Sequence, residues 1–166
     1  MEKRDLYNIE KKLTGETILK GEEIPKKRYI IVVLVFIQNS DGKFLIQKRS
    51  ERKNGKYATT GGHPKSGESS LQGIITEVQE EIGVKLSEND LKLYYSGRSD
   101  KERVFFDDYY IKMDIEDIRK LELQESEVSS VDWFSEKEIK QLMRENKFFK
   151  NHYEEFEILL DWLKDE

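Results

Sequence analysis

The chain has 166 residues, of which 36% are hydrophobic and 38% charged, and its formal net charge is −5 at pH 7. This length predicts one domain over residues 1–166 with a hydrophobic core, and a negative chain without a long basic run argues against nucleic-acid binding. The absence of cysteine excludes disulfides and thiolate metal sites, and the lack of a secretory or membrane-spanning segment favours a cytoplasmic protein.

Most of the predicted elements are strands. In chain order, strands are expected at residues 6–9, 16–20, 29–38, 43–49, 91–97, 103–113 and 128–134. The first two surround a turn at Thr14-Gly15. The third is a β-branched apolar run typical of a buried strand, and after a turn at residues 39–42 it is predicted to form a hairpin with the fourth.

Three helices complete the predicted architecture. One begins near residue 70, and a second begins at the capping box 135–138 and runs to about residue 145. Apolar residues from Phe149 to Leu163 predict a final amphipathic helix. This order of elements suits an α/β/α sandwich around a mixed sheet, with Trp133 and Trp162 expected in its core.

The first helix carries three acids on one face. Glu77, Glu80 and Glu81 stand at i, i+3 and i+4, with no basic residue among them. Like charges at these spacings destabilise a helix by roughly 0.2–0.5 kcal/mol per pair, and the helix dipole disfavours negative charge in the last turns. We therefore expect a cation to offset both effects, and carboxylate oxygens suit Mg2+ or Mn2+.

The ends and the buried face of this helix are also predictable. Ser69 or Ser70 suits the N-cap and Gly83 the C-terminal stop. Gly62 and Gly67 lie in the preceding loop, where they let the backbone approach a metal or a phosphate. The apolar stripe at helical period consists of Leu71, Ile74, Ile75, Val78 and Ile82.

Residues 62–84 resemble the box of the Nudix hydrolases, which reads G, five residues, E, seven residues, R-E-U-x-E-E-x-G-U, with U aliphatic. The residues in register are Gly62, Glu68, Glu77, Val78, Glu80, Glu81, Gly83 and Val84. The resemblance covers nearly the whole chain. It implies the Nudix fold and a hydrolase that cleaves a nucleoside-diphosphate-linked or other organic diphosphate by attack of water on phosphorus.

The resemblance also implies a metal site. Glu77, Glu80 and Glu81 would bind Mg2+ or Mn2+, helped by the carbonyl of Gly62. Glu68 would brace the loop or contact the metal through water. Bound cations of this kind neutralise charge on phosphate oxygens and lower the pKa of a bound water.

A carboxylate must then accept the proton of the attacking water. Glu80 and Glu81 are the catalytic candidates within the box, and Glu125 and Glu127, which precede the strand at 128–134, are alternatives. Arg49, at the end of a predicted strand, is a candidate for binding substrate phosphate.

One box residue departs from the family pattern. Thr76 stands where the family has an arginine that pairs with the box glutamates and orients them. Arg52, Arg98 or Arg103 are candidates to replace it. Without a replacement, the glutamates of the metal-free protein should repel one another, and metal binding should raise the melting temperature by mass action.

A closer resemblance connects the chain to the branch of the family that includes isopentenyl-diphosphate isomerases and related hydrolases. The motif Gly62-His63-Pro64 matches the isomerase loop, which makes His63 a candidate substrate-binding residue. Isomerases carry a catalytic cysteine just before this motif, where this chain has Gly61. They also gather several histidines around a metal, whereas here the other histidine is His152 and Leu34 stands in the central strand where relatives often have histidine.

We therefore interpret the chain as an isomerase-like hydrolase. Two alternatives stay open, an isopentenyl-diphosphate isomerase-like enzyme and a non-catalytic Nudix-fold module that binds a ligand. The partner is expected to be a small-molecule diphosphate, with residues 105–110 lining its pocket or alternating between core and surface. The sequence leaves the identity of the substrate and the oligomeric state open, a homodimer included.

Overall fold

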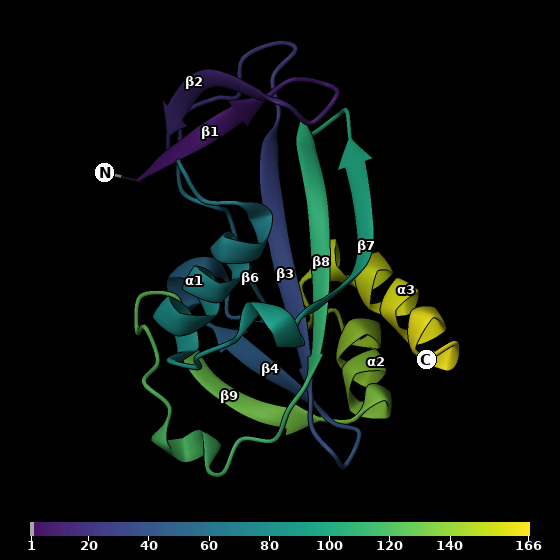
Figure 1. Ribbon diagram of the computed structural model, residues 1–166. Coiled ribbons are helices and arrows are strands. Elements are labelled where there is room, and N and C mark those ends of the chain that lie inside the picture. The colour runs from purple at the N-terminus through teal and green to yellow at the C-terminus, as the bar shows by residue number, and fades with distance from the viewer. Residues whose placement is uncertain (1) are drawn as a thin grey trace.

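The computed structural model describes residues 2–166, which form a mixed sheet with helices on both faces and a separate N-terminal hairpin (Figure 1). The strands are β1 (Lys3–Tyr7), β2 (Leu13–Leu19), β3 (Ile30–Gln38), β4 (Phe44–Arg49), β5 (Tyr57–Ala58), β6 (Thr60–Gly62), β7 (Lys92–Ser99), β8 (Val104–Lys112) and β9 (Val128–Phe134). The helices are α1 (Ser70–Ile82), α2 (Glu136–Arg144) and α3 (Tyr153–Lys164). None of the helices in residues 2–166 is long and apolar enough to cross a membrane.

Strand β3 lies at the centre of the sheet, whose order is β5-β4-β3-β8-β7, with β6 paired to β3 and β9 to β4. β3 runs parallel to β8 along its whole length and antiparallel to β6. β3 and β4 pair only at Gln38 and Phe44, so the predicted hairpin is confirmed only next to its turn. Beyond that pair β6 takes the place beside β3 from Val33 to Val35, and β4 pairs with β9 instead.

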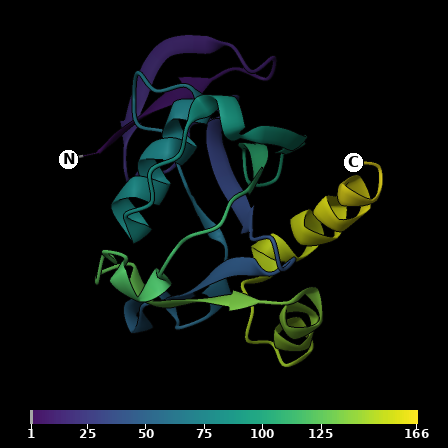
Figure 2. The ribbon, with the colours of Figure 1, turned by 60° about the horizontal axis from the view of Figure 1, so that its bottom comes forward.

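The alternation of side chains along β3 explains why its whole sequence is apolar. Val33 and Val35 pack with Val78 of α1 in one hydrophobic cluster. On the other face, Leu34 packs with Phe156 of α3 in a second cluster that also contains α2. Figure 2 shows α1 on one side of the sheet and the two C-terminal helices on the other. The predicted α/β/α sandwich around a mixed sheet is confirmed, with Trp133 and Trp162 partly buried against the two clusters.

The helix ends follow the predicted capping chemistry. Ser69 caps α1 in a capping box with Gln72, and Gly83 ends the helix in the left-handed conformation at φ 70°. α2 begins at the predicted capping box, in which Ser135 accepts a hydrogen bond from the backbone N–H of Glu138. α3 begins later than predicted, because residues 150–152 form a 3₁₀ turn.

The N-terminal hairpin departs from the prediction. Thr14 and Gly15 lie within β2, and the turn occupies residues 8–12 instead. The side-chain oxygen of Asn8 accepts hydrogen bonds from the backbone N–H groups of Glu10 and Lys12, which fixes that turn. Both strands therefore begin about three residues earlier than the predicted 6–9 and 16–20.

This hairpin holds the loop in front of α1. Tyr7 and Tyr29 exchange backbone hydrogen bonds of 2.8 and 2.9 Å, which attach β1 to the start of β3. The carboxylate of Asp5 accepts hydrogen bonds from the hydroxyl of Ser66 and the backbone N–H of Gly67. The loop that leads into the acidic helix is thus fixed from both sides, by β6 and by the hairpin.

Candidate active site

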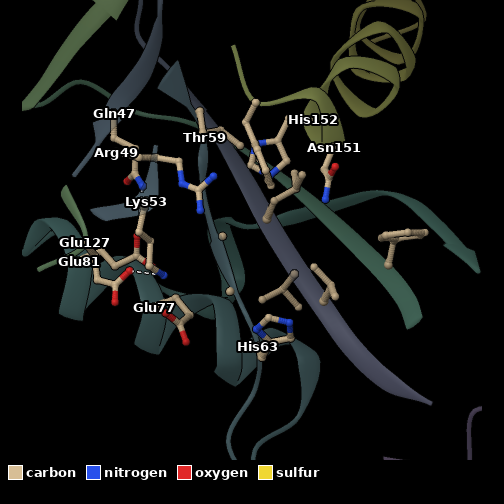
Figure 3. Close-up of a pocket in the computed structure, with 18 of the residues that line it drawn as sticks. Gln47, Arg49, Lys53, Thr59, His63, Glu77, Glu81, Glu127, Asn151 and His152 are labelled. Carbon is tan, nitrogen blue, oxygen red and sulfur yellow. Dashed lines mark hydrogen bonds and ion pairs between the residues drawn. The ribbon is translucent and has the colours of Figure 1, made fainter. Parts of the chain in front are cut away.

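A cleft of about 520 Å³ lies where β3 and β4 separate. Its walls come from β3, the end of β4, the loop 61–63, the acidic face of α1 and the 3₁₀ turn at residues 150–152. In the close-up of Figure 3, the acids of α1 lie on one side and Asn151 and His152 on the other, with Arg49 between them. The predicted site residues Gly62, His63, Glu77, Glu80, Glu81 and Arg49 all line this cleft.

Two of the acids form a pair, in which Glu81 is buried and Glu77 half-buried. The contact between the carboxyl groups of Glu77 and Glu81 favours the protonated form of Glu81. Burial and this contact raise the pKa of Glu81 to about 8, and burial raises the pKa of Glu77. Gln47 of β4 donates to Glu81 at 3.2 Å and accepts from the hydroxyl of Thr60, which fixes the position of the Glu81 side chain.

The third acid has a different partner. Glu80 is exposed and forms an ion pair of 3.0 Å with the ammonium group of Lys65. Consequently the part of the chain that the structure describes holds no group of three or more His, Asp and Glu side chains arranged to bind a metal ion. The three glutamates line one cleft, but only Glu77 and Glu81 contact each other.

The residues present nevertheless suit a divalent cation. A Cβ atom at Gly62 would lie 2.5 Å from the carboxyl carbon of Glu77, so a larger residue at this position would displace the Glu77 side chain from the loop. The donor set is then two carboxyl groups, a backbone carbonyl and a third carboxylate one turn away, all hard oxygen ligands. A cation would supply the charge that offsets the two carboxylates.

Glu68 connects the loop to the helix. One of its carboxylate oxygens accepts from the backbone N–H of Lys65 at 2.7 Å and the other from the hydroxyl of Thr76 at 2.6 Å. Glu68 does not line the cleft. Its contacts are those of a residue that braces the loop.

Two basic side chains, Arg49 and Lys53, also line the cleft. The guanidinium carbon of Arg49 lies 4.4 Å from the ring centre of Phe149, and its Nη1 atom is buried without a hydrogen-bond partner. Burial lowers the pKa of Arg49, although the group stays cationic. Lys53 lines the cleft beside Glu81 and forms an ion pair with Glu127 (Figure 3). A buried cationic donor without a partner is well suited to an anionic ligand.

The two histidines of the chain are neutral at pH 7. Burial lowers the pKa of His63 to about 4 and that of His152 to about 3. The Nδ1 atom of His152 is buried without a partner, and its ring packs edge-on against Phe149. Both rings therefore offer the cleft one neutral donor and one acceptor rather than a charge.

For several candidate residues, the structure shows whether they line the cleft or contact the box glutamates. Glu127 lies in the cleft, whereas Glu125 is exposed and outside it. Of the residues 105–110, only Phe106 lines the cleft. The three candidate replacements for the box arginine do not contact the box glutamates. Arg98 pairs with Asp100, Arg103 donates to the carbonyl of Ile24, and Arg52 is exposed.

Sequence reasoning missed the residues that reach the cleft from distant segments. They are Arg4, Gln47, Lys53, Phe149 and Asn151. Arg4 comes from the N-terminal hairpin, and its Nε atom is buried without a partner. No local pattern marks these residues, because the pairing of β4 with β9 and the packing of the hairpin bring them to the site.

A second buried acid pair lies beside the cleft. Asp108 of β8 is 1% exposed, and its Oδ2 atom is buried without a hydrogen-bond partner beside Glu155 of α3, a residue that lines the cleft. Burial raises the pKa of Asp108 to about 9 and that of Glu155 to about 7, with Asp107 and Glu154 adding repulsion. These shifts favour the protonated form of Asp108 at pH 7.

We expect Asp108→Asn to reduce the loss of stability at alkaline pH. Both folded pKa values lie above their ordinary values of 3.8 and 4.5, so the pair contributes stability in acid that is lost as the pH rises towards 9. For each proton that only the folded state holds, the free energy of unfolding falls by up to about 1.4 kcal/mol per pH unit. Urea unfolding at pH 5, 7 and 9 measures this, with the exposed Glu157→Gln as a control on α3. If the free energy of unfolding depends on pH in the same way in the wild type and in Asp108→Asn, the raised pKa of Asp108 is refuted.

Comparisons with known proteins show which proteins this chain resembles. The family model described as the NUDIX domain matches residues 28–156. The proteins lmo0368 of Listeria monocytogenes and lin0387 of Listeria innocua, both called uncharacterized Nudix hydrolases, are each 33% identical over 153 residues, covering 89% of this chain and 88% of the relative.

Solved structures share the fold. DR0079 of Deinococcus radiodurans has a TM-score of 0.70 at 23% identity and covers 89% of this chain and 91% of its own. The NUDIX domain of Shewanella oneidensis NrtR, solved with ADP ribose, has a TM-score of 0.65 at 18% identity and covers 81% of this chain and 88% of its own. A Francisella tularensis bifunctional NMN adenylyltransferase/ADP ribose pyrophosphatase, solved with AMP and a Mn ion, has a TM-score of 0.62 at 22% identity, over 86% of this chain and 43% of its own.

Proposed function

The chain belongs to the Nudix hydrolases, pyrophosphohydrolases that act on acid anhydrides of phosphorus, and on that premise we propose that it cleaves an organic diphosphate with the help of Mg2+ or Mn2+. The observation that carries the proposal is the composition of the cleft. The acid pair of Glu77 and Glu81 lines the same cleft as the guanidinium of Arg49, whose Nη1 atom is buried without a partner. A diphosphate bound in the cleft would meet both a metal site and a cationic donor.

Glu77, Glu80, Glu81 and the carbonyl of Gly62 would hold the cation. When bound, such a cation neutralises charge on the phosphate oxygens and lowers the pKa of a water. Glu80 lines the cleft while Lys65 pairs with its Oε1 atom, so its Oε2 atom would be left for the cation. A cation held there would favour the ionised forms of Glu77 and Glu81.

The other residues of the cleft act on the substrate directly. Arg49 donates to phosphate oxygens, and His63 contributes a neutral hydrogen-bonding group. Glu80, Glu81 and Glu127 are the acids beside these groups, and one of them accepts the proton of the attacking water. We assign this role within the box, to Glu81 or Glu80, because these acids belong to the proposed metal site that would hold the attacking water.

The substrate we propose is a nucleoside-diphosphate-linked or other organic diphosphate. The rings of Phe106 and Phe149 line the cleft and provide apolar surface for the organic part. The Gly62-His63-Pro64 loop supports a place in the isomerase-like branch. We also propose that residues 1–166 act as one domain, since the hairpin contributes Arg4 to the cleft and hydrogen bonds to its loop.

Isomerase chemistry is not favoured. The position before the Gly-His-Pro motif is Gly61, where a Cβ atom would lie 2.7 Å from the carbonyl oxygen of Val33 and 3.2 Å from the Cβ of Leu34. No side chain, cysteine included, fits there without movement of the backbone of β3. No feature of the cleft favours a non-catalytic module, because the box acids and two cationic side chains are both present.

A screen of diphosphate compounds tests the proposal. Nucleoside diphosphates, dinucleotides, nucleotide sugars and prenyl diphosphates are incubated with Mg2+, Mn2+ or EDTA, and products are identified by 31P NMR. We expect metal-dependent release of two phosphate products, with 18O from labelled water in one of them. An isomerised diphosphate would support the isomerase instead, and no turnover of any compound with either metal would reject the enzyme we propose.

A further inference from the structure

We propose that Lys65 is the positioning residue of this metal site, and that with Thr76 it replaces the arginine that the box pattern would place at position 76. This inference rests on the proposed function. Lys65 neutralises Glu80 and holds it beside the Glu77–Glu81 pair, while Thr76 holds Glu68. The ion pair of Lys65 with Glu80 and the hydrogen bond of Thr76 with Glu68 together replace the contacts that one guanidinium group would make.

The charge balance at the box requires such a residue. Glu68, Glu77, Glu80 and Glu81 bring four carboxyl groups to one helix and its preceding loop. Among the residues that the structure describes, Lys65 is the only cation within ion-pair distance of any of them, at 3.0 Å from Glu80. Interactions with Glu80, Glu77 and Glu68 raise the pKa of Lys65 above its ordinary value, against the effect of its partial burial.

The contacts form one continuous chain from loop to helix. The side chain of Lys65 donates to Glu80, its backbone N–H donates to Glu68 at 2.7 Å, and Glu68 in turn accepts from Thr76 at 2.6 Å. Thr76 and Glu80 are four residues apart on α1, so they lie on the same face one turn from each other. The loop and the helix are therefore connected twice, once through each acid.

The four-residue spacing between positions 76 and 80 predicts that an arginine at position 76 could form the ion pair with Glu80 that Lys65 forms in this protein. A guanidinium group at 76 lies one turn before Glu80, within reach of its carboxylate and of Glu68. Lys65 and an arginine at 76 are then alternative partners of the same acid. Each should matter only when the other is absent.

The test is a double-mutant cycle on the full chain. Lys65→Met keeps the length of the side chain and removes its charge. We expect it to weaken Mn2+ binding, measured by titration calorimetry, about 10–100-fold, as for other residues that orient metal ligands, and to lower kcat with little change in KM. Thr76→Arg alone should change little, and Lys65→Met/Thr76→Arg should recover most of the lost Mn2+ affinity.

A matched control and a metal-free measurement isolate the role of Lys65. Lys85 is an exposed lysine just after α1 that forms no ion pair in the described residues, so Lys85→Met should leave Mn2+ affinity unchanged. In EDTA, Lys65→Met should lower the melting temperature by only a few degrees, because one half-exposed ion pair contributes little stability. Addition of Mn2+ should raise the melting temperature of Lys65→Met less than that of the wild type.

Three outcomes would overturn the inference. Unchanged Mn2+ affinity in Lys65→Met shows that Lys65 only braces the loop, and failure of Thr76→Arg to rescue that variant shows that the two positions are not equivalent. Both leave the proposed function intact. A wild-type protein that binds no Mn2+ and cleaves no diphosphate rejects the proposed function, and the role of Lys65 with it.

Discussion

Glu81→Gln is expected to lower turnover on a verified diphosphate substrate by about 10²–10⁴-fold, whether Glu81 binds the metal or accepts the proton of the water. The side chain is 7% exposed and lies between Glu77 and Gln47, so glutamine of the same volume fits the site. The charge is lost while the hydrogen-bonding pattern of the protonated acid is largely kept. Steady-state kinetics at saturating Mg2+ measure the loss.

The metal-free protein provides the control for this prediction. Because the pKa of Glu81 is raised to about 8, the acid already holds a proton for much of the time at pH 7, and glutamine imitates that form. The melting temperature in EDTA should therefore stay the same or rise while turnover falls. Glu125→Gln, an exposed acid outside the cleft, should retain full activity. Wild-type rates in Glu81→Gln would remove Glu81 from the mechanism.

The acidic helix was predictable because its determinants are local. A serine cap, a glycine stop and an apolar stripe at helical period all lie within residues 69–83, and each acts over one or two turns. β3 was predictable for a similar reason, since a strand buried on both faces must be apolar throughout. The N-terminal turn was placed wrongly because the side chain of Asn8, not the glycine, determines it.

The contacts around the acids were not predictable. The sequence suggested three arginines as partners of the box, but the cation in contact is Lys65, whose position depends on how the loop meets the hairpin. Phe149 was expected to begin the last helix, and it instead precedes a 3₁₀ turn and packs under Arg49. Such contacts depend on strand order and loop path, which residue spacing does not encode.

Arg49→Met is expected to lower kcat/KM by about 10²–10³-fold, the effect of removing one strong donor aimed at developing charge. Nη1 of Arg49 is buried without a protein partner, and the guanidinium group stacks on Phe149. Methionine keeps the apolar contact with the ring and removes the charge and the donors. Since no protein hydrogen bond of Nη1 is lost, the melting temperature should change little or rise. Initial rates and thermal unfolding of the same preparation measure both effects.

Two further variants distinguish an anion-binding role from a packing role. Arg52 lies three residues later, exposed and outside the cleft, so Arg52→Met should have full activity. Arg49→Lys keeps the charge but loses the planar donor group and its stacking on Phe149, so it should recover only part of the loss. Phosphate, as a weak competitive inhibitor, should bind the wild type more tightly than Arg49→Met. Equal inhibition of the two, together with equal kcat/KM, would show that the substrate does not contact Arg49.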